Sequence, residues 1–317
     1  MFDDLINILT NFLGQSRRHS ESKGQISFDC PVCGDDGVGK GNLEVNYIKG
    51  VYKCWSCGQI NDTHGRIQYL IKTYGSREDL TAFKLIEKDL KFDLEYKSIS
   101  SESIITLPKE FQSLLTKSSS DEYQMAIAYL NDRKIDKSII EKFNLGYCTS
   151  GKYSGRIIIP SYDEFNKINF FSSRTYKKWI KPKYLNPDTD KTSIIFNEGK
   201  VNWDATVYLI EGPFDHLVVP NSTPLLGKYL DYDYLMFEKI FEKASGLVVT
   251  VLDGDALKDS KKLFFLLNNS KLRGRVRSVL SIPDKYDISK IYELLGNKGV
   301  LKTLRTAKII PDHQEIY

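Results

Sequence analysis

VYLIEGPFD, residues 207–215, and LVVTVLDGD, residues 247–255, are the most informative stretches of this sequence. Each is an apolar run of strand length, rich in Val, Ile and Leu, that ends in acidic residues. Such runs are typical of buried parallel strands, and ligands bind outside the carboxyl ends of these strands in an open sheet. The sequence therefore predicts an α/β sheet that brings Glu211, Asp253 and Asp255 to one edge.

Three carboxylates at one edge are hard oxygen ligands of the kind that Mg²⁺ or Mn²⁺ prefers. Asp215 lies in the first stretch, and Asp287 follows a third predicted strand at 275–280, so both are further candidates. The alternative is that the acids belong to solvated turns, where Asp-Gly-Asp is common. Two such stretches in succession favour a bound metal.

Four of the five cysteines form two CxxC pairs, Cys30/Cys33 and Cys54/Cys57, separated by 20 residues. Two thiolates two residues apart can reach one ion from a tight turn, and two such turns complete a tetrahedron. We expect one structural zinc. A redox dithiol is the weaker alternative, because one pair would be enough for it.

The second cysteine pair lies among aromatic and basic residues, notably Tyr52, Lys53 and Trp55. Stacked bases and phosphates are bound by this mixture, so the three are candidates for nucleic-acid recognition. The aromatic residues could equally cover the core of a domain too small for a large one. The window alone leaves both interpretations open.

The rest of the sequence limits the protein class. With 41% hydrophobic residues the chain can bury a core, and a net charge of +4 permits a nucleic-acid partner without requiring one. There is no apolar run of 18 residues, and the N-terminus is acidic where a signal peptide would be basic. We expect a cytoplasmic protein with no membrane partner.

Local patterns predict the elements of the N-terminal region. Apolar residues spaced by three and four predict a helix over 2–13, and Ile67, Leu70 and Ile71 should form the apolar face of another. Further predicted elements are strands at 25–28, 43–48 and 51–55 and a helix over 77–90.

With these motifs the chain resembles the DnaG-type DNA primases of bacteria and their phages, in a phage-like form with four cysteines and no helicase domain. Glu211-Gly212 and Asp253-Gly254-Asp255 resemble the signature of the TOPRIM fold. The stretches Ala128–Tyr147, Gly155–Pro160 and Lys183–Pro187 are similar to primase segments in the same order. The resemblance covers residues 25 to 295.

The resemblance implies a mixed α+β and α/β chain in four parts. An N-terminal zinc ribbon, β-rich with flanking helices, precedes a polymerase domain that contains a Rossmann-like TOPRIM core. The parts are a zinc-ribbon DNA-binding domain at 1–94, a linker at 95–105, an N-terminal polymerase subdomain at 106–204, and the TOPRIM subdomain with the C-terminal end at 205–317.

The implied function is synthesis of short RNA primers on a single-stranded DNA template, by metal-dependent nucleotidyl transfer from ribonucleoside triphosphates. Glu211, Asp253 and Asp255 would be catalytic and hold the metals. Partners would be a separate replicative helicase and a single-stranded DNA-binding protein, in the host cytoplasm if the chain is phage-encoded. The residues implied to bind nucleotide or template are Arg156, Arg174, Lys183, Asn186 and Lys228.

One departure concerns the third metal-binding element. The family's Asp-Pro-Asp stands here as Asp287-Ile288-Ser289, so its second aspartate is replaced by serine. Ser289 is the main support for one alternative, a zinc-ribbon and TOPRIM protein that binds DNA or recruits replisome proteins without synthesis. The other alternative is a TOPRIM nuclease, because the same carboxylates and metal could cut nucleic acid.

Overall fold

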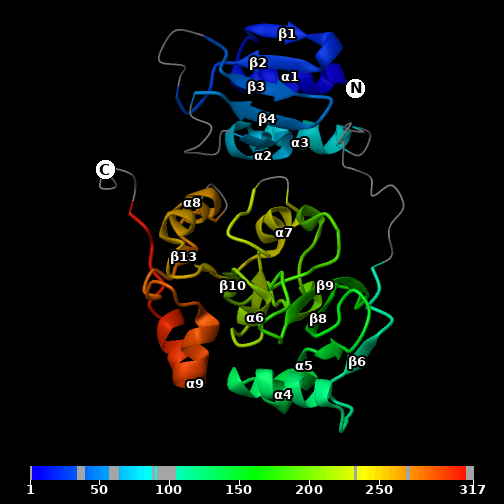
Figure 1. Cartoon of the computed structure of the whole chain (residues 1–317). Coiled ribbons are helices and arrows are strands. Elements are labelled where there is room, and N and C mark those ends of the chain that lie inside the picture. The colour runs from blue at the N-terminus through cyan, green and yellow to red at the C-terminus, as the bar shows by residue number, and fades with distance from the viewer. Residues whose placement is uncertain are drawn as a thin grey trace. The chain divides into compact units, whose positions relative to one another are not determined.

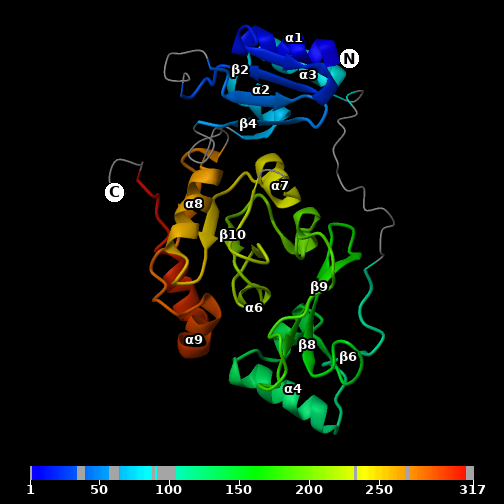
Figure 2. The same ribbon diagram turned by 45° about the horizontal axis from the view of Figure 1, so that its top comes forward.

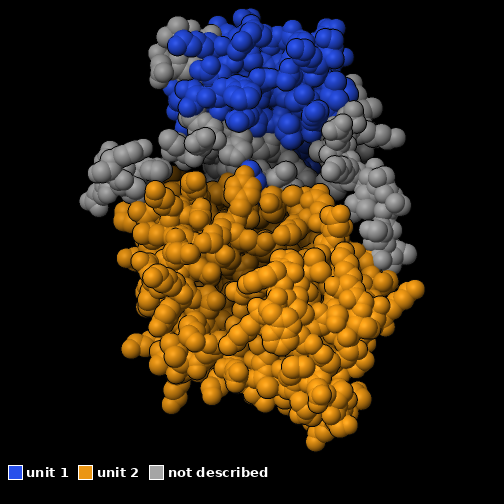
Figure 3. All heavy atoms as spheres, viewed as in Figure 1, with its two compact units in different colours: residues 1–103, 231–233, 268–271 blue, residues 104–230, 234–267, 272–317 orange. Residues whose placement is uncertain are grey.

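The computed structural model describes residues 2–33, 40–56, 64–87, 90, 105–231, 234–268 and 272–311. The chain divides into two compact units (Figure 3): residues 1–103, 231–233 and 268–271 form unit 1, and residues 104–230, 234–267 and 272–317 form unit 2. Among the described residues, no helix combines the length and apolar character that a membrane crossing requires. The predicted linker lies outside the described residues except for residue 105, and the predicted domain boundaries stay predictions.

Unit 1 is built on an antiparallel sheet with the strand order β1-β2-β3-β4-β5, of which Figure 1 labels β1 to β4. The strand predicted at 43–48 is shorter in the structure, because Asn46 Oδ1 accepts a hydrogen bond from Lys49 N (2.8 Å) and turns the chain. The strands are β1 (Arg18–Ser20), β2 (Gln25–Phe28), β3 (Leu43–Asn46), β4 (Val51–Cys54) and β5 (His64–Arg66).

Three helices complete unit 1: α1 (Phe2–Leu13), α2 (Ile67–Tyr74) and α3 (Arg77–Ile86). The helix predicted over 2–13 is confirmed, and the predicted apolar face of α2 is fully buried. Ser76 and Asp79 begin α3 with a reciprocal capping box. These helices and the sheet enclose one apolar core.

Unit 2 contains two sheets. The first is antiparallel, in the order β6-β7-β8-β9, and its longest pairing is the β8–β9 hairpin. Two helices, α4 and α5, precede β7. The elements of this part are β6 (Phe111–Ser113), α4 (Asp121–Asp132), α5 (Lys137–Lys142), β7 (Gly146–Cys148), β8 (Arg156–Tyr162) and β9 (Ile168–Thr175).

The second sheet is parallel throughout, in the order β11-β10-β12-β13. Figure 2 shows α8 and α9 on one side of β10 and the β8–β9 hairpin on the other. The α/β arrangement expected from the two apolar, acid-ended stretches is thus present. Its elements are β10 (Val207–Ile210), α6 (Pro213–His216), β11 (Ser222–Pro224), α7 (Leu235–Lys243), β12 (Val248–Val251), α8 (Leu257–Leu267), β13 (Val276–Ser278) and α9 (Ile288–Leu304).

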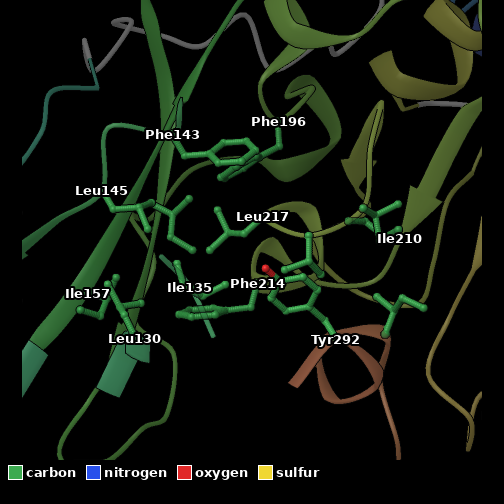
Figure 4. Packing of buried hydrophobic residues seen from close by; sticks show 14 of the residues in the cluster. Leu130, Ile135, Phe143, Leu145, Ile157, Phe196, Ile210, Phe214, Leu217 and Tyr292 are labelled. Carbon is green, nitrogen blue, oxygen red and sulfur yellow. The ribbon is translucent and has the colours of Figure 1, made fainter. Parts of the chain in front are cut away.

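One apolar core joins the two sheets of unit 2. Figure 4 shows Phe214 of α6 and Leu217, the residue that follows this helix, in the middle of the core, with Leu145 on one side and Ile210 on the other. Because α6 directly follows Glu211, burial of its apolar side chains fixes the position of the acidic edge. The short helix α6 therefore connects the core to the candidate site.

Candidate functional site

Unit 1 carries a cluster of thiols. One sulfur from each of Cys30, Cys33 and Cys54 lies within 4.8 Å of the others, and the Cys33 and Cys54 sulfurs are 3.8 Å apart. Cys30 and Cys54 are buried at 2% and 0% exposure. Cys57, the fourth predicted ligand, lies outside the described residues.

This geometry fits a zinc ion. A tetrahedron with zinc–sulfur distances of about 2.3 Å has sulfur–sulfur edges of about 3.8 Å. The separation of the Cys33 and Cys54 sulfurs equals such an edge. The predicted structural zinc is therefore supported by the donor set as well as by the spacing of the cysteines.

The three predicted recognition residues of unit 1 differ in accessibility. Trp55 is 64% exposed, and its Nε1 donates a hydrogen bond to Glu44 Oε2 (2.8 Å). Lys53 Nζ lies 4.5 Å from the centroid of the Trp55 ring. Tyr52, by contrast, belongs to the core at 4% exposure. An exposed aromatic ring with an adjacent cation is therefore formed by Trp55 and Lys53 alone of the three.

In unit 2 the parallel sheet brings the predicted carboxylates to one edge. Strands β10 and β12 are neighbours with Ile210 opposite Val251, so Glu211 and Asp253 both follow the carboxyl ends of paired strands. Asp255 follows two residues later and its side chain is 63% exposed. The electrostatic coupling of all three shows that they share one environment.

Burial and mutual repulsion disfavour the ionised forms of Glu211 and Asp253. Desolvation raises the pKa of Glu211, and the charges of Asp215 and Asp255 raise it further. Desolvation, followed by the charges of Glu211 and Asp287, raises the pKa of Asp253 to about 7. Glu211 Oε2 is buried and has no hydrogen-bond partner among the described residues. An unpartnered carboxylate oxygen beside other carboxylates fits a divalent cation.

Asp215 is buried in the same cluster. Its Oδ1 accepts hydrogen bonds from Ser289 N (3.1 Å) and Ser289 Oγ (2.5 Å), and its Oδ2 accepts one from Gly212 N (3.2 Å). Desolvation, then the charge of Asp287, raises the pKa of Asp215 to about 7. Ser289 thus donates two hydrogen bonds to a buried carboxylate. From the sequence alone, Ser289 was only the residue that replaces a metal-binding aspartate of the family.

An ion pair and a main-chain hydrogen bond lie on the exposed side of the cluster. Lys228 Nζ pairs with Asp255 Oδ1 at 2.9 Å, and this hydrogen bond raises the pKa of Lys228 and lowers that of Asp255. Gly254 N donates to Tyr286 O (2.9 Å), and a Cβ atom on Gly254 would lie 2.0 Å from Pro283 O. Only glycine fits between these two loops.

A basic pocket of 380 Å³ lies in unit 2 and contains Arg174 and Lys183, two of the predicted binding residues. The crowding of cations, Arg174 first, holds the pKa of Lys183 below its usual range, whereas Asp287 and Asp253 act in the opposite direction. The charges of the carboxylate cluster therefore act on Lys183 in the pocket. Its lining residues are Tyr129, Arg133, Arg174, Thr175, Tyr176, Lys177, Lys178, Ile180, Lys181 and Lys183.

Arg133 is a pocket residue that the sequence analysis did not single out. It stands in the primase-like segment, beside Asn131-Asp132, but its side chain reaches a site formed mainly by residues 174–183. The guanidinium groups of Arg133 and Arg174 lie 5.2 and 4.8 Å from the ring centroid of Phe214. Because Phe214 belongs to α6, this helix links the basic pocket to the acidic edge.

The other predicted binding residues support the pocket from within. Arg156 is 2% exposed, and its guanidinium donates to Pro182 O (2.7 Å) and Lys183 O (3.2 Å). Asn186 Oδ1 accepts from Ser173 N at 3.1 Å. Both side chains hold the main chain that carries Lys183, so the structure gives them positioning contacts.

No protein-family model matches the chain. A DNA primase of Enterobacteria phage T4 is 24% identical over an aligned length of 246 residues, and the alignment covers 69% of this chain and 69% of the phage protein. A DNA primase of Campylobacter jejuni is 22% identical over an aligned length of 327 residues, and the alignment covers 86% of this chain and 51% of the bacterial protein. The chain thus spans about half the length of this bacterial relative.

Solved structures agree with these relatives. The zinc-binding and RNA polymerase domains of the Aquifex aeolicus primase match with a TM-score of 0.50 and 19% identity, over 96% of this chain and 83% of that chain. A DnaG primase catalytic domain bound to single-stranded DNA matches with a TM-score of 0.50 and 18% identity, over 60% of this chain and 73% of that chain. The expected fold class is confirmed.

Proposed function

We propose that this chain, a DnaG-type primase by its sequence relatives and its fold, synthesises short RNA primers on single-stranded DNA. The observation that carries the proposal is the pairing of an acidic sheet edge with a basic pocket through the single helix α6. Nucleotidyl transfer requires both, because the phosphate groups of template and nucleotide are anionic and the reacting oxygens need a cation.

Glu211, Asp253 and Asp255 would hold magnesium or manganese, with Asp215 and Asp287 supporting them. When bound, the divalent cations would lower the pKa of the attacking 3′-hydroxyl and neutralise charge on the leaving pyrophosphate. Glu211 would also accept the hydroxyl proton, through a carboxylate oxygen that does not hold a cation. The 3′ oxygen bonds to the α-phosphorus as the bond to the pyrophosphate oxygen breaks.

The basic residues would position the substrates. Arg174 and Lys183 line the pocket and would contact phosphates of the template or of the ribonucleoside triphosphate. Lys228 would exchange its contact with Asp255 for a nucleotide phosphate. Trp55 and Lys53 of the zinc-ribbon unit would contact a single-stranded start site by stacking and charge. A separate replicative helicase and a single-stranded DNA-binding protein would act with the chain.

A primer-synthesis assay tests this function. The full chain is incubated with mixed-sequence single-stranded DNA, Mg²⁺ or Mn²⁺ and four ribonucleoside triphosphates, one of them labelled. We expect short labelled RNA from the wild type and from Asp284→Asn, an exposed carboxylate near the cluster, but none from Glu211→Gln or Asp253→Asn. Cleavage of the DNA without labelled RNA would identify a nuclease. Absence of both products, with a replicative helicase added, would contradict an enzymatic role.

A further inference from the structure

The basic pocket of unit 2 presents buried donors that the described chain does not satisfy. The Nε atoms of Arg133 and Arg174 are both buried without a hydrogen-bond partner in the part of the chain that the structure describes. Six of the pocket's lining residues are Lys or Arg and none is acidic. Arg133 Nη1 already pairs with Glu293 Oε1 (3.1 Å), but the two Nε donors stay unsatisfied among six cations, which is costly unless a further anion accepts from them. The pocket is thus complementary to phosphate.

A hydrogen-bonded turn formed by residues 177–180 lies at the edge of this pocket. Ile180 N donates to Lys177 O (3.2 Å), which closes a turn with Lys178 and Trp179 at its centre. The base of the turn is anchored, because Thr175 Oγ1 donates to Lys177 O (3.0 Å) and Lys177 Nζ pairs with Glu122. Trp179 is 74% exposed at the tip, between two pocket residues, Lys178 and Ile180.

An exposed tryptophan on an anchored basic turn is energetically unfavourable when no ligand covers its ring. Its large apolar ring stays in water, and the neighbouring lysines prevent ordinary apolar burial there. Bases of single-stranded nucleic acid stack on such rings while cations hold the backbone. The charge of the pocket and the ring of Trp179 therefore favour the same ligand class.

We propose that Trp179 stacks a base of single-stranded DNA while Arg133 and the lysines of the adjacent pocket hold a neighbouring phosphate. The inference rests on the proposed function only in taking nucleic acid as the ligand. A strand is favoured over a free nucleotide because the ring lies outside the pocket, on the turn, so that base and phosphate are held at successive positions. Stacking on Trp179 is tolerant of sequence, as a template contact must be.

Binding of a fluorescein-labelled dT15 oligonucleotide to the full chain, without divalent cations, tests the proposal. We expect Trp179→Ala to weaken binding about tenfold and Trp179→Phe to retain most of it, since the loss of one stacked base has this size. Lys181→Gln should instead lower the salt dependence, with a log–log slope smaller by about 0.7. Thermal unfolding of each variant checks that it is folded.

Phe165 supplies a matched control. It is 75% exposed and precedes β9, whereas Trp179 follows β9, but its neighbour Glu164 is acidic and paired with Lys239 and Lys243. Phe165→Ala should bind dT15 like the wild type. An equal loss in Phe165→Ala and Trp179→Ala would overturn the proposal, as would unsaturable binding by the wild type.

Fluorescence gives a direct second measurement. The chain has three tryptophans, so Trp55→Phe combined with Trp203→Phe leaves Trp179 as the only one. Saturating dT15 should quench its emission, and unchanged emission would contradict stacking.

Displacement of dT15 by equimolar dTMP would mean that a free nucleotide is the ligand. Primer synthesis with unchanged dT15 binding by Trp179→Ala refutes this inference alone, whereas Trp179-dependent binding without primer synthesis refutes only the proposed function.

Discussion

The thiol cluster of unit 1 and the carboxylate cluster of unit 2 are both suited to metals, yet they are organised in opposite ways. The thiols converge to one tetrahedral edge of 3.8 Å inside a small core. Among the described residues, no three carboxylates gather within the 4.8 Å that encloses the three sulfurs. The carboxylates instead remain apart: Glu211 Oε2 has no hydrogen-bond partner among the described residues, and the pKa values of Glu211 and Asp253 are raised. The first arrangement suits a permanent ion that holds a fold, and the second suits ions that arrive with substrate.

The largest expected effect concerns the thiols. Cys30→Ser should release zinc and unfold unit 1, because structural zinc contributes about 10–16 kcal/mol of apparent binding free energy. Zinc content and limited proteolysis measure this loss, with unit 2 staying protected. Cys148→Ala is the matched control, since Cys148 is a buried thiol of unit 2, where burial raises its pKa to about 12. Retained zinc in Cys30→Ser would break the comparison.

Next in size is the serine beside the buried carboxylate. Ser289→Asp should lower the unfolding free energy by about 3 kcal/mol in metal-free buffer, because a second charge would face Asp215. Ser289→Ala removes one hydrogen bond and should cost about 1 kcal/mol. Urea unfolding measures both. If Ser289→Asp is as stable as Ser289→Ala, charge repulsion does not destabilise the metal-free carboxylate cluster, and this difference from the thiol cluster is lost.

Neutralising a carboxylate should have the opposite sign. Asp253→Asn should stabilise metal-free protein by about 2 kcal/mol once solvent screening of this half-buried group is included. Millimolar Mg²⁺ should raise the melting temperature of the wild type and not that of Asp253→Asn. A destabilised Asp253→Asn would mean that this site, like the thiols, supports the fold.

The pH dependence sharpens the same point. The pKa of Asp253 is about 7 in the folded protein against an ordinary value of 3.8, so the folded state binds the proton more tightly. The penalty for its charge is therefore fully present above pH 7 and is relieved as the pH falls from about 7 to about 4. Thermal unfolding should show the advantage of Asp253→Asn shrinking over this range. A gap that widens on acidification would contradict the raised pKa.

The smallest effect belongs to the exposed ion pair. Lys228→Gln should change the melting temperature least of these variants, because solvent screens its contact with Asp255. In the primer-synthesis assay, however, it should raise the nucleotide concentration needed for half-maximal rate. Lys285→Gln, an exposed cation of the loop before Asp287, is the control. An unchanged nucleotide dependence would remove Lys228 from the candidate site.

Features carried by local sequence could be predicted. The parallel sheet and its acid-bearing edge followed from two apolar runs, and the helix over 2–13 followed from the spacing of Leu5, Ile8 and Leu9. These features depend on periodicity and on strand ends, which are local. The three described cysteines likewise converge as their spacing indicated.

Features that depend on the direction of a side chain could not be predicted. Arg156 lies in a primase-like stretch and was predicted to bind nucleotide or template, yet its guanidinium points inward and donates to two main-chain carbonyls. Ser289 gave no sign of its bonds to Asp215, which lies 74 positions away. The turn with Trp179 did carry a signal, because lysines flank the ring as Lys53 and Lys49 flank Tyr52 and Trp55, but its pocket needs α4 as well.

The seat of Gly254 has an evolutionary consequence. Gly254 N donates to the main-chain oxygen of Tyr286, and the atoms nearest to a Cβ at position 254 are main-chain atoms of Pro283 and Ile282. The side chains of these neighbours can therefore drift among homologues while position 254 cannot, so an alignment should show an invariant glycine opposite variable partners. Exchange of the 253–255 loop between homologues should then succeed only when the backbone path of the 283–287 loop is kept, whatever side chains that loop carries.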